Sequence, residues 1–231
     1  MISFIKKMSR IFRFIFPKSK IIFNDLKKIE PISRQFGFDR GTPIDRYYTE
    51  KFLSKYSNLI KGHVLEVADN NYSLKFGPPN IKSDILHYDK SNPRATIIAD
   101  LTKKEDIPKN KFDCFICTQT FNFIYDVKKA IKGSYNLLKK DGVLLGTVSG
   151  ISQISRYDMD RWGDYWRFTD KSIKMLLEEA GFKDIKIYPM GNVLSAISLL
   201  QGIAVEDLPK KKLLDKHDED YQMTICFIAT K

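Results

Sequence analysis

Cysteine is scarce in this sequence. Three cysteines in 231 residues are too few, and odd in number, for a disulfide framework, so we expect a reducing compartment. Cys114 and Cys117 form a C-x-x-C pattern, but they fall within an expected strand, where side chains three apart point to opposite faces. Core packing is therefore favoured over metal or redox chemistry. The three histidines are scattered singly, with His87 expected in the core, and we expect no metal site.

Long apolar runs and glycine-rich nucleotide motifs are also missing. No stretch of 18 uninterrupted apolar residues occurs, so we expect no membrane-spanning helix. The pattern G-x-G-x-x-G is absent, which argues against an NAD-dependent dehydrogenase, because pyrophosphate needs a close backbone approach at a helix N-terminus. The length suits one α/β domain with a sizeable core, which we place at residues 21–231.

Acidic residues are absent from the first 20 positions, although the chain carries a net charge of +11. Apolar residues recur there at helical spacing, which predicts a cationic amphipathic helix ending before Pro17. It is too short to span a bilayer and lacks a cleavage site of the secretory type. Three destinations are open: an anionic membrane surface, a partner such as a glycosyltransferase, or the domain's own core. We expect a cytoplasmic protein, with the inner face of the membrane as a peripheral location.

Three expected strands end on polar residues. The first, HVLEVADNNY at residues 63–72, carries Glu66 and runs into a turn. ILHYD closes on Asp89, and TIIADL closes on Asp100. In an open parallel sheet, ligands bind outside the carboxyl ends of the strands, and an acid about 20 residues after the first turn is placed to accept hydrogen bonds from ribose. The pattern predicts a nucleoside-containing ligand.

This order of Glu66, turn, Asp89 and Asp100, followed by strands at 112–121 and 141–150, resembles the class I S-adenosylmethionine-dependent methyltransferases. The resemblance spans residues 36–230. It implies an α/β, Rossmann-like fold, with a mostly parallel seven-stranded sheet, an antiparallel last strand and helices on both faces. It also implies S-adenosyl-L-methionine as the cofactor, held by Glu66, Ala68, Asp69, Asn70, Asp89, Asp100, Leu101 and Gln119, with Arg40 or Arg46 pairing with its methionine carboxylate.

The first turn departs from the family's usual E-x-G-x-G, because Ala68 and Asn70 replace its glycines. Glycine allows positive φ and a close backbone approach. Alanine adds one methyl group, and asparagine tolerates the left-handed conformation better than most residues. The turn is therefore compatible with a bound cofactor, which should fit less closely against the backbone than it would beside glycine. The alternative is a non-catalytic module of the same fold that partners glycosyltransferases.

The phrases FDRGTPIDRYY (38–48) and SQISRYDMDRWGDYWRFT (152–169) are similar to a bacterial methyltransferase group associated with surface-glycan synthesis. Enzymes of this fold that methylate amino groups commonly carry Asn/Asp-Pro-Pro-Tyr/Phe after the fourth strand. Here that position reads Thr118-Gln119-Thr120-Phe121. This difference counts against methylation of nucleic-acid amino groups, although an RNA methyltransferase remains a further alternative because of the positive charge.

Residues 152–169 alternate aromatic and charged side chains and are expected to form a substrate lid. Aromatic faces flanked by carboxylates and guanidiniums suit a sugar; the alternative is an ordered loop that only packs. Trp162 and Trp166 are four apart, which predicts one shared aromatic surface. Asp158 or Asp160 is the candidate base for O-methylation of a sugar or other small hydroxyl acceptor. The expected substrate contacts are Tyr157, Arg161, Trp162 and Trp166.

The remaining pattern predicts helices at 48–59, 126–139, 170–182 and 191–206. The third of these should begin at Thr169-Asp170 and stop at Gly181. Strands are expected at 184–190 and 223–230.

Overall fold

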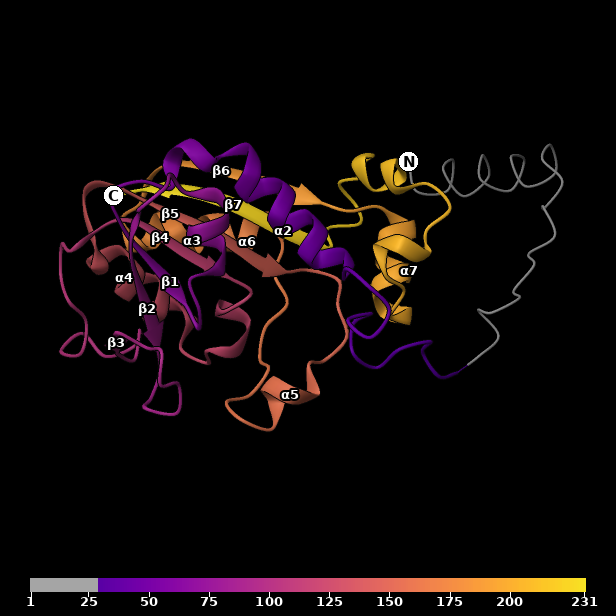
Figure 1. The fold of residues 1–231 in the computed structure, drawn as a ribbon, viewed down its shortest axis with the longest axis horizontal. Helices are drawn as coiled ribbons and strands as arrows, with labels where there is room; N and C mark the ends of the chain where they lie inside the picture. Colours follow the sequence, from indigo (N-terminus) through magenta and orange to yellow (C-terminus); the bar gives the residue numbers. More distant parts are fainter. Residues whose placement is uncertain (1–28) are drawn as a thin grey trace, which may run out of the picture. The chain divides into compact units, whose positions relative to one another are not determined.

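The fold is built on one sheet of seven strands, which are labelled in Figure 1. They are β1 (His63–Val67), β2 (Lys82–His87), β3 (Ile97–Ile98), β4 (Phe112–Thr118), β5 (Leu138–Ser149), β6 (Lys183–Met190) and β7 (Thr224–Thr230). Their order is β3-β2-β1-β4-β5-β7-β6. The pairs from β3 to β5 are parallel, and β7 runs antiparallel to both of its neighbours. The expected fold, mostly parallel with an antiparallel last strand, is confirmed.

This computed structural model describes residues 29–231. The amphipathic helix expected at residues 1–20 lies outside the described residues. Residues 32–231 form one compact unit. Within the described part of the chain, no helix is both long and apolar enough to cross a membrane.

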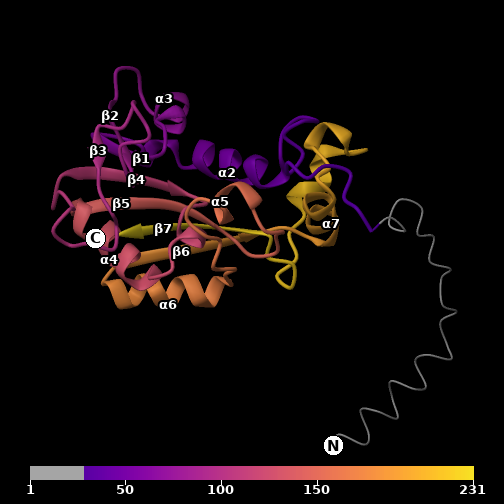
Figure 2. The same ribbon diagram turned by 90° about the horizontal axis from the view of Figure 1, so that it is seen from below.

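Helices cover both faces of the sheet, as Figure 2 shows. On one face lie α2 (Ile44–Lys55) and α3 (Asn71–Phe76), and on the other α4 (Val127–Leu137) and α6 (Asp170–Ala180). Cys114 packs into the core on the α2 face and Cys117 into the core on the α4 and α6 face, and both thiols are free. The expected packing role of the C-x-x-C pattern is confirmed. Helix α6 also begins as expected, because Thr169 and Ser172 form a reciprocal cap.

Several element bounds differ from the prediction. The helix expected at 48–59 begins four residues earlier, at Ile44, directly after Pro43, which stands at the N-cap position without a side-chain cap hydrogen bond. It ends at Lys55, before the 3-10 turn η2 (Ser57–Leu59). The helix expected at 191–206 divides into α7 (Val193–Gln201) and η4 (Val205–Asp207). Gly202 separates them with φ 67°, a left-handed conformation that ends a helix. Three shorter elements complete the fold of residues 29–231: η3 (Phe121–Phe123), α5 (Arg156–Met159) and η5 (Lys211–Asp215).

The segment from α7 to η5 anchors the chain that leads into α2. Arg40 donates two hydrogen bonds of 2.8 Å to Asp207. The backbone N–H and hydroxyl of Thr42 donate to Glu206 at 2.7 and 2.8 Å. The Tyr48 hydroxyl donates to a backbone carbonyl of η5 at 2.9 Å. This segment therefore fixes the start of α2, the part of that helix that reaches the site described below.

Candidate functional site

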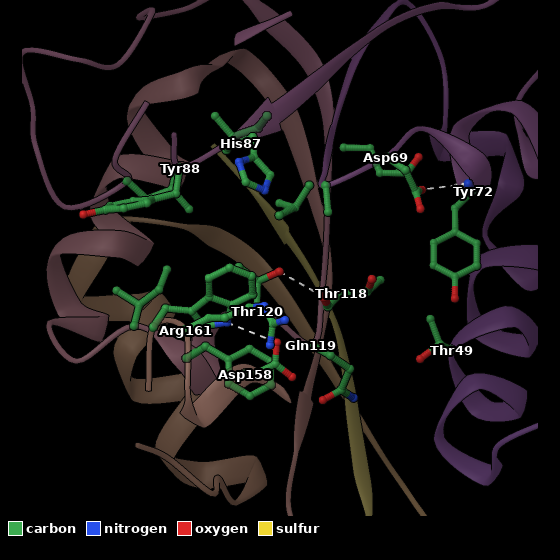
Figure 3. A pocket seen from close by; sticks show the side chains of 18 of the residues that line it. Thr49, Asp69, Tyr72, His87, Tyr88, Thr118, Gln119, Thr120, Asp158 and Arg161 are labelled. Atoms are coloured by element: carbon green, nitrogen blue, oxygen red, sulfur yellow. Dashed lines mark hydrogen bonds between the residues drawn. The ribbon is translucent and has the colours of Figure 1, made fainter. Parts of the chain in front are cut away.

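A cavity of about 980 Å³ opens at the carboxyl ends of the parallel strands. The ends of β1, β2 and β4 and the residues after β3 line it, together with one side of α2 and α3 and the segment 158–165. In Figure 3, Thr49 and Tyr72 lie on one side, and Asp158 and Arg161 lie on the other. The strand-end crevice expected from the sequence is therefore present.

The cavity brings together most of the residues expected to bind the cofactor or substrate. Those that line it are Glu66, Ala68, Asp69, Asp100, Leu101, Gln119, Asp158, Arg161 and Trp162. Those that do not are Asn70, Asp89, Tyr157, Asp160 and Trp166. The second group shares a cause, since each side chain is turned to a neighbour or to solvent by a local hydrogen bond or contact.

The turn after β1 keeps a glycine-like shape without glycine. Ala68 has φ 68°, in the left-handed region, whereas Asn70 has φ −125°. The left-handed conformation therefore falls on alanine, and asparagine's tolerance for it is not used. The Asn70 side chain instead accepts a hydrogen bond from Arg94 Nη2 at 3.0 Å, which holds it out of the cavity.

Glu66 joins the end of β1 to the start of α3. Its side chain is buried, and Oε1 accepts from Tyr72 N at 3.0 Å. Oε2 accepts from Ser73 N at 2.7 Å and from Ser73 Oγ at 2.6 Å. Burial raises the pKa of Glu66 to about 7, although the hydrogen bonds from Ser73 and Tyr72 oppose the rise. The hydrogen bonds of the Glu66 carboxylate thus hold α3 and the turn after β1 at the cavity wall.

The end of β2 corrects two expectations. The strand stops at His87, and His87 and Tyr88 line the cavity. The Asp89 carboxylate instead accepts from Ser91 N at 2.9 Å and lies 3.3 Å from His87 Nδ1. Hydrogen bonds from Ser91 lower the pKa of Asp89. Asp89 is therefore not placed as a ribose acceptor, and His87 is a half-buried cavity residue instead of a core residue.

Asp100 is the strand-end acid that does face the cavity. One oxygen, Oδ1, accepts from Thr102 N at 2.9 Å and from Thr102 Oγ1 at 2.7 Å. The second oxygen has only Lys103 nearby, at 4.0 Å. The side chain is 18% exposed, so a free carboxylate oxygen is held in a fixed direction at the cavity wall.

Gln119 presents an unused donor at the end of β4. Its backbone has φ 48° and donates to Thr147 O at 2.8 Å. Its Oε1 accepts from Ser149 Oγ at 2.6 Å. The buried Nε2 has no hydrogen-bond partner among the residues described. Leaving a buried donor unpaired costs about 1–3 kcal/mol, which is the arrangement expected where a ligand oxygen completes the site.

The two arginines considered for a ligand carboxylate are separated by the fold. Arg40 is bound to Asp207 outside the cavity. Arg46 lines the cavity, with its guanidinium carbon 4.7 Å from the centre of the Phe38 ring. Burial raises the pKa of the neighbouring Asp45. Arg46 is therefore the arginine that can serve a carboxylate in the cavity.

The segment 152–169 is an ordered cover built on an ion pair whose carboxylate is buried. Arg167 donates to both oxygens of Asp164, at 2.5 and 2.9 Å, and Ser155 N donates to the same carboxylate at 3.0 Å. The Asp164 side chain is 1% exposed. Burial acts to raise the pKa of Asp164, but the hydrogen bonds from Arg167 and Ser155 outweigh it and lower the pKa.

Asn122 is a site residue that the sequence did not reveal. Its carbonyl accepts from Tyr165 N at 2.9 Å and Trp166 N at 3.2 Å, and its Nδ2 donates to Trp166 O at 2.9 Å. It is 1% exposed. Asn122 thus ties the cover to the end of β4. The one signal in the sequence is a polar residue enclosed by Phe121 and Phe123.

The tryptophans are not paired with each other, contrary to expectation, and each packs against a different tyrosine. Gly163, with φ 94°, turns the chain between them. Trp162 lines the cavity and lies 6.2 Å from Tyr157, centre to centre. Trp166 packs beside Tyr125 at 6.3 Å, and its Nε1 donates to two backbone carbonyls. Helical spacing therefore failed here, because the helix ends before it reaches Trp162.

The two candidate bases are also separated. Asp158 lines the cavity, where Oδ1 accepts from Trp162 Nε1 at 3.1 Å and Oδ2 accepts from Ser155 Oγ at 2.5 Å. Asp160 has a side chain that is 61% exposed and lies 3.5 Å from Arg156. Asp160 is exposed and does not line the cavity, so Asp158 is the better placed of the two as a base.

Comparison with known proteins agrees with this geometry. Residues 62–146 match a family model described as a methyltransferase domain, and they include the strand ends of β1 to β4. The fold is that of a class I methyltransferase. No curated protein matches the sequence. The domain match agrees with a methyltransferase, and the solved structures below agree with the fold.

Solved structures with the same fold share little sequence. An S-adenosylmethionine-dependent methyltransferase from Archaeoglobus fulgidus has a TM-score of 0.53 and 14% identity, covering 80% of this chain and 94% of that one. Phosphoethanolamine N-methyltransferase 2 from Haemonchus contortus, in complex with S-adenosyl-L-methionine, has a TM-score of 0.55 and 16% identity, covering 94% and 61%. The cyclase SpnF has a TM-score of 0.54 and 15% identity, covering 88% and 87%.

The turn after β1 leads to a stability prediction. A non-glycine residue in the left-handed region carries strain of about 1–2 kcal/mol, partly offset by the greater freedom of glycine in the unfolded chain. Ala68→Gly should therefore leave the free energy of unfolding unchanged or raise it by up to about 1 kcal/mol. The matched control Ala130→Gly, in the buried face of α4, should lower it by about 1 kcal/mol or more. Urea denaturation measures the free energy of unfolding of both variants. An equal loss of stability in Ala68→Gly and Ala130→Gly would show that the backbone of Ala68 is not strained.

Glu66 leads to a pH prediction. Its pKa is about 7 when folded against an ordinary value of 4.5, so the folded protein holds a proton that the unfolded chain releases between these values. The resulting stability is complete below about pH 4.5 and is lost as the pH rises through 7. Glu66→Gln resembles the protonated form and does not titrate. The free energy of unfolding of the wild type, relative to Glu66→Gln, should fall between pH 5 and 7.5; a flat difference would show that Glu66 is ionised throughout.

Proposed function

We propose that this chain transfers a methyl group from S-adenosylmethionine to a hydroxyl of a sugar or another small acceptor, in surface-glycan synthesis. One observation carries the proposal. A single cavity has strand-end groups such as Asp100 on one side and, on the other, Asp158 among exposed aromatic rings. The first set suits a nucleoside and the second a carbohydrate.

The residues present fit the cofactor. Ala68 adopts the left-handed backbone that a glycine would provide, so the turn keeps its shape. Asp100 offers a free carboxylate oxygen to a hydroxyl or amino donor, and Gln119 Nε2 and Arg46 offer donors to a carboxylate. S-adenosylmethionine, when bound, supplies a methyl group already activated by a positively charged sulfur. The protein then has to align an acceptor and exclude water.

Asp158 has the position required of a base. Methyl transfer to a hydroxyl oxygen forms a C–O bond and releases the hydroxyl proton, which a carboxylate at the cavity wall can take. Hydrogen bonds from Ser155 Oγ and Trp162 Nε1 hold the Asp158 carboxylate in place. Both donors lie in the same cover, so the base and an aromatic ring for the sugar move together.

Two alternatives make different predictions. A non-catalytic module of this fold would not bind the cofactor. One of the solved structures with this fold is the cyclase SpnF, so the fold by itself does not establish methyl transfer. An RNA methyltransferase would place a cationic surface around the cavity, whereas the cavity wall carries Asp45, Asp69, Asp100 and Asp158.

Calorimetric titration tests cofactor binding. The wild type should bind S-adenosylmethionine and S-adenosylhomocysteine, and Asp100→Ala should weaken binding by about 1.5–3 kcal/mol, because a charged acceptor is lost. The matched control is Asp89→Ala, whose carboxylate lies outside the cavity and whose loss should leave affinity close to that of the wild type. If the wild type binds neither ligand, the result would favour the alternative that the chain is a non-catalytic module of this fold.

Methyl transfer tests the base. Asp158→Asn should lower turnover by about 100-fold or more, the range for loss of a general base, with cofactor affinity unchanged. Asp160→Asn is the control, since Asp160 is exposed and outside the cavity, and it should retain wild-type turnover. The assay is incorporation of labelled methyl into neutral sugars. Similar turnover in the two variants would exclude Asp158 as the base.

A further inference from the structure

Aromatic side chains extend beyond the cavity onto the exposed surface of the cover. We call Tyr125, Tyr157, Trp162, Tyr165 and Trp166 the aromatic rim; their exposed fractions are 72%, 62%, 41%, 48% and 37%. Three of them line the cavity and two do not. Ring contacts join Tyr125, Tyr165 and Trp166 in one group and Tyr157 and Trp162 in another, and both groups reach the cavity. The rim therefore offers binding surface for a part of a ligand that lies outside the cavity.

The chemistry of the rim favours carbohydrate. Every member has a flat ring and a polar end, so it can contact sugar C–H groups while its hydroxyl or indole N–H reaches water or a sugar oxygen. Arg161 lies 3.5 Å from the centre of the Tyr157 ring and donates to Tyr157 O at 2.8 Å. Tyr125 contacts Tyr165 at 5.4 Å and Trp166 at 6.3 Å, centre to centre. These contacts fix the rings in place before a ligand arrives.

The charge of the cavity opposes phosphate. Lys75 is paired with Glu50 at 2.7 Å. The carboxylates of Asp45, Asp69 and Asp158 have no cationic partner within 4.0 Å among the described residues, although the whole chain is strongly basic. On the cover side, Arg161 is the one cavity-lining cation among the residues described, and one of its donors is used by Tyr157 O. A diphosphate binds best to several free donors, and the cover side does not supply them.

We infer that the acceptor is the terminal sugar of an assembled, uncharged oligosaccharide, and that nucleotide-activated sugars are poor acceptors. The terminal sugar occupies the cavity beside Asp158, and the preceding sugars lie along the aromatic rim. Methylation then follows the glycosyl-transfer reaction, which removes the nucleoside diphosphate. This inference rests on the proposed function.

An acceptor series tests the inference with the wild-type protein. The acceptors are glucose, galactose, mannose and rhamnose, their di-, tri- and tetrasaccharides, and the corresponding nucleoside diphosphate sugars. For the sugar that is methylated, kcat/KM should rise about ten-fold or more from mono- to trisaccharide, since the added sugars gain contacts with the aromatic rings of the rim. The nucleotide form should be at least ten-fold poorer than the trisaccharide.

Variants locate the effect at the rim. Tyr157→Ala, outside the cavity, should lower kcat/KM for the trisaccharide about three- to ten-fold more than kcat/KM for the monosaccharide, because Tyr157 also packs against the cavity-lining Trp162 and Arg161; the affinity for S-adenosylhomocysteine should stay unchanged. The control is Tyr221→Ala, an exposed tyrosine (38%) outside the rim and the cavity, which should change none of these. A loss in Tyr157→Ala that is equal for short and long acceptors would overturn the role of the rim.

The outcomes separate the inference from the proposed function. Preference for the nucleotide sugar, or rates independent of acceptor length, would overturn the inference while methyl transfer to sugar stands. Absence of transfer to every sugar form, with cofactor binding intact, would contradict the proposed function and the inference together.

Discussion

The buried carboxylate of Glu66 is the interaction on which the site depends. It lies at the end of the central strand and receives three hydrogen bonds from the first residues of α3. These bonds fix the turn in which Ala68 is left-handed and place Asp69 at the cavity wall. These donors, at the start of a helix where negative charge is favourable, offset part of the cost of burying the carboxylate, and the remainder appears as the raised pKa of Glu66. A glycine-poor turn can thus retain the required shape.

Much of the fold followed from the sequence, because local pattern and fold agree there. The short apolar runs of β1 and β4 are buried on both faces, as in parallel sheets, and the cap at Thr169 and stop at Gly181 have local causes. The end of β2 was misplaced, since ILHYD contains no signal that the strand stops at His87. Asp89 then turns back through Ser91, a local hydrogen bond that competes with the expected ligand role.

The cover was predicted as an element but not in its geometry. Its aromatic and charged composition indicated a binding segment, whereas the positions of its side chains depend on Asp164, Arg167 and Asn122, which act together only in the folded protein. Asn122 is 43 residues from Tyr165 and 44 from Trp166 in the sequence. No periodicity relates such residues, so spacing alone could not place Trp162 inside the cavity and Trp166 outside it.

The way in which Asn122 holds the cover has a consequence for how such a protein diversifies. It contacts Tyr165 and Trp166 entirely through their main-chain N–H and carbonyl groups. The side chain of Tyr165 can therefore be exchanged without loss of this anchor, whereas Trp166 also donates from Nε1 to two backbone carbonyls. A lineage that keeps the asparagine, the tryptophan and the Asp164–Arg167 pair is free to vary the ring at position 165, which lines the cavity, without disturbing the strand ends on the opposite side.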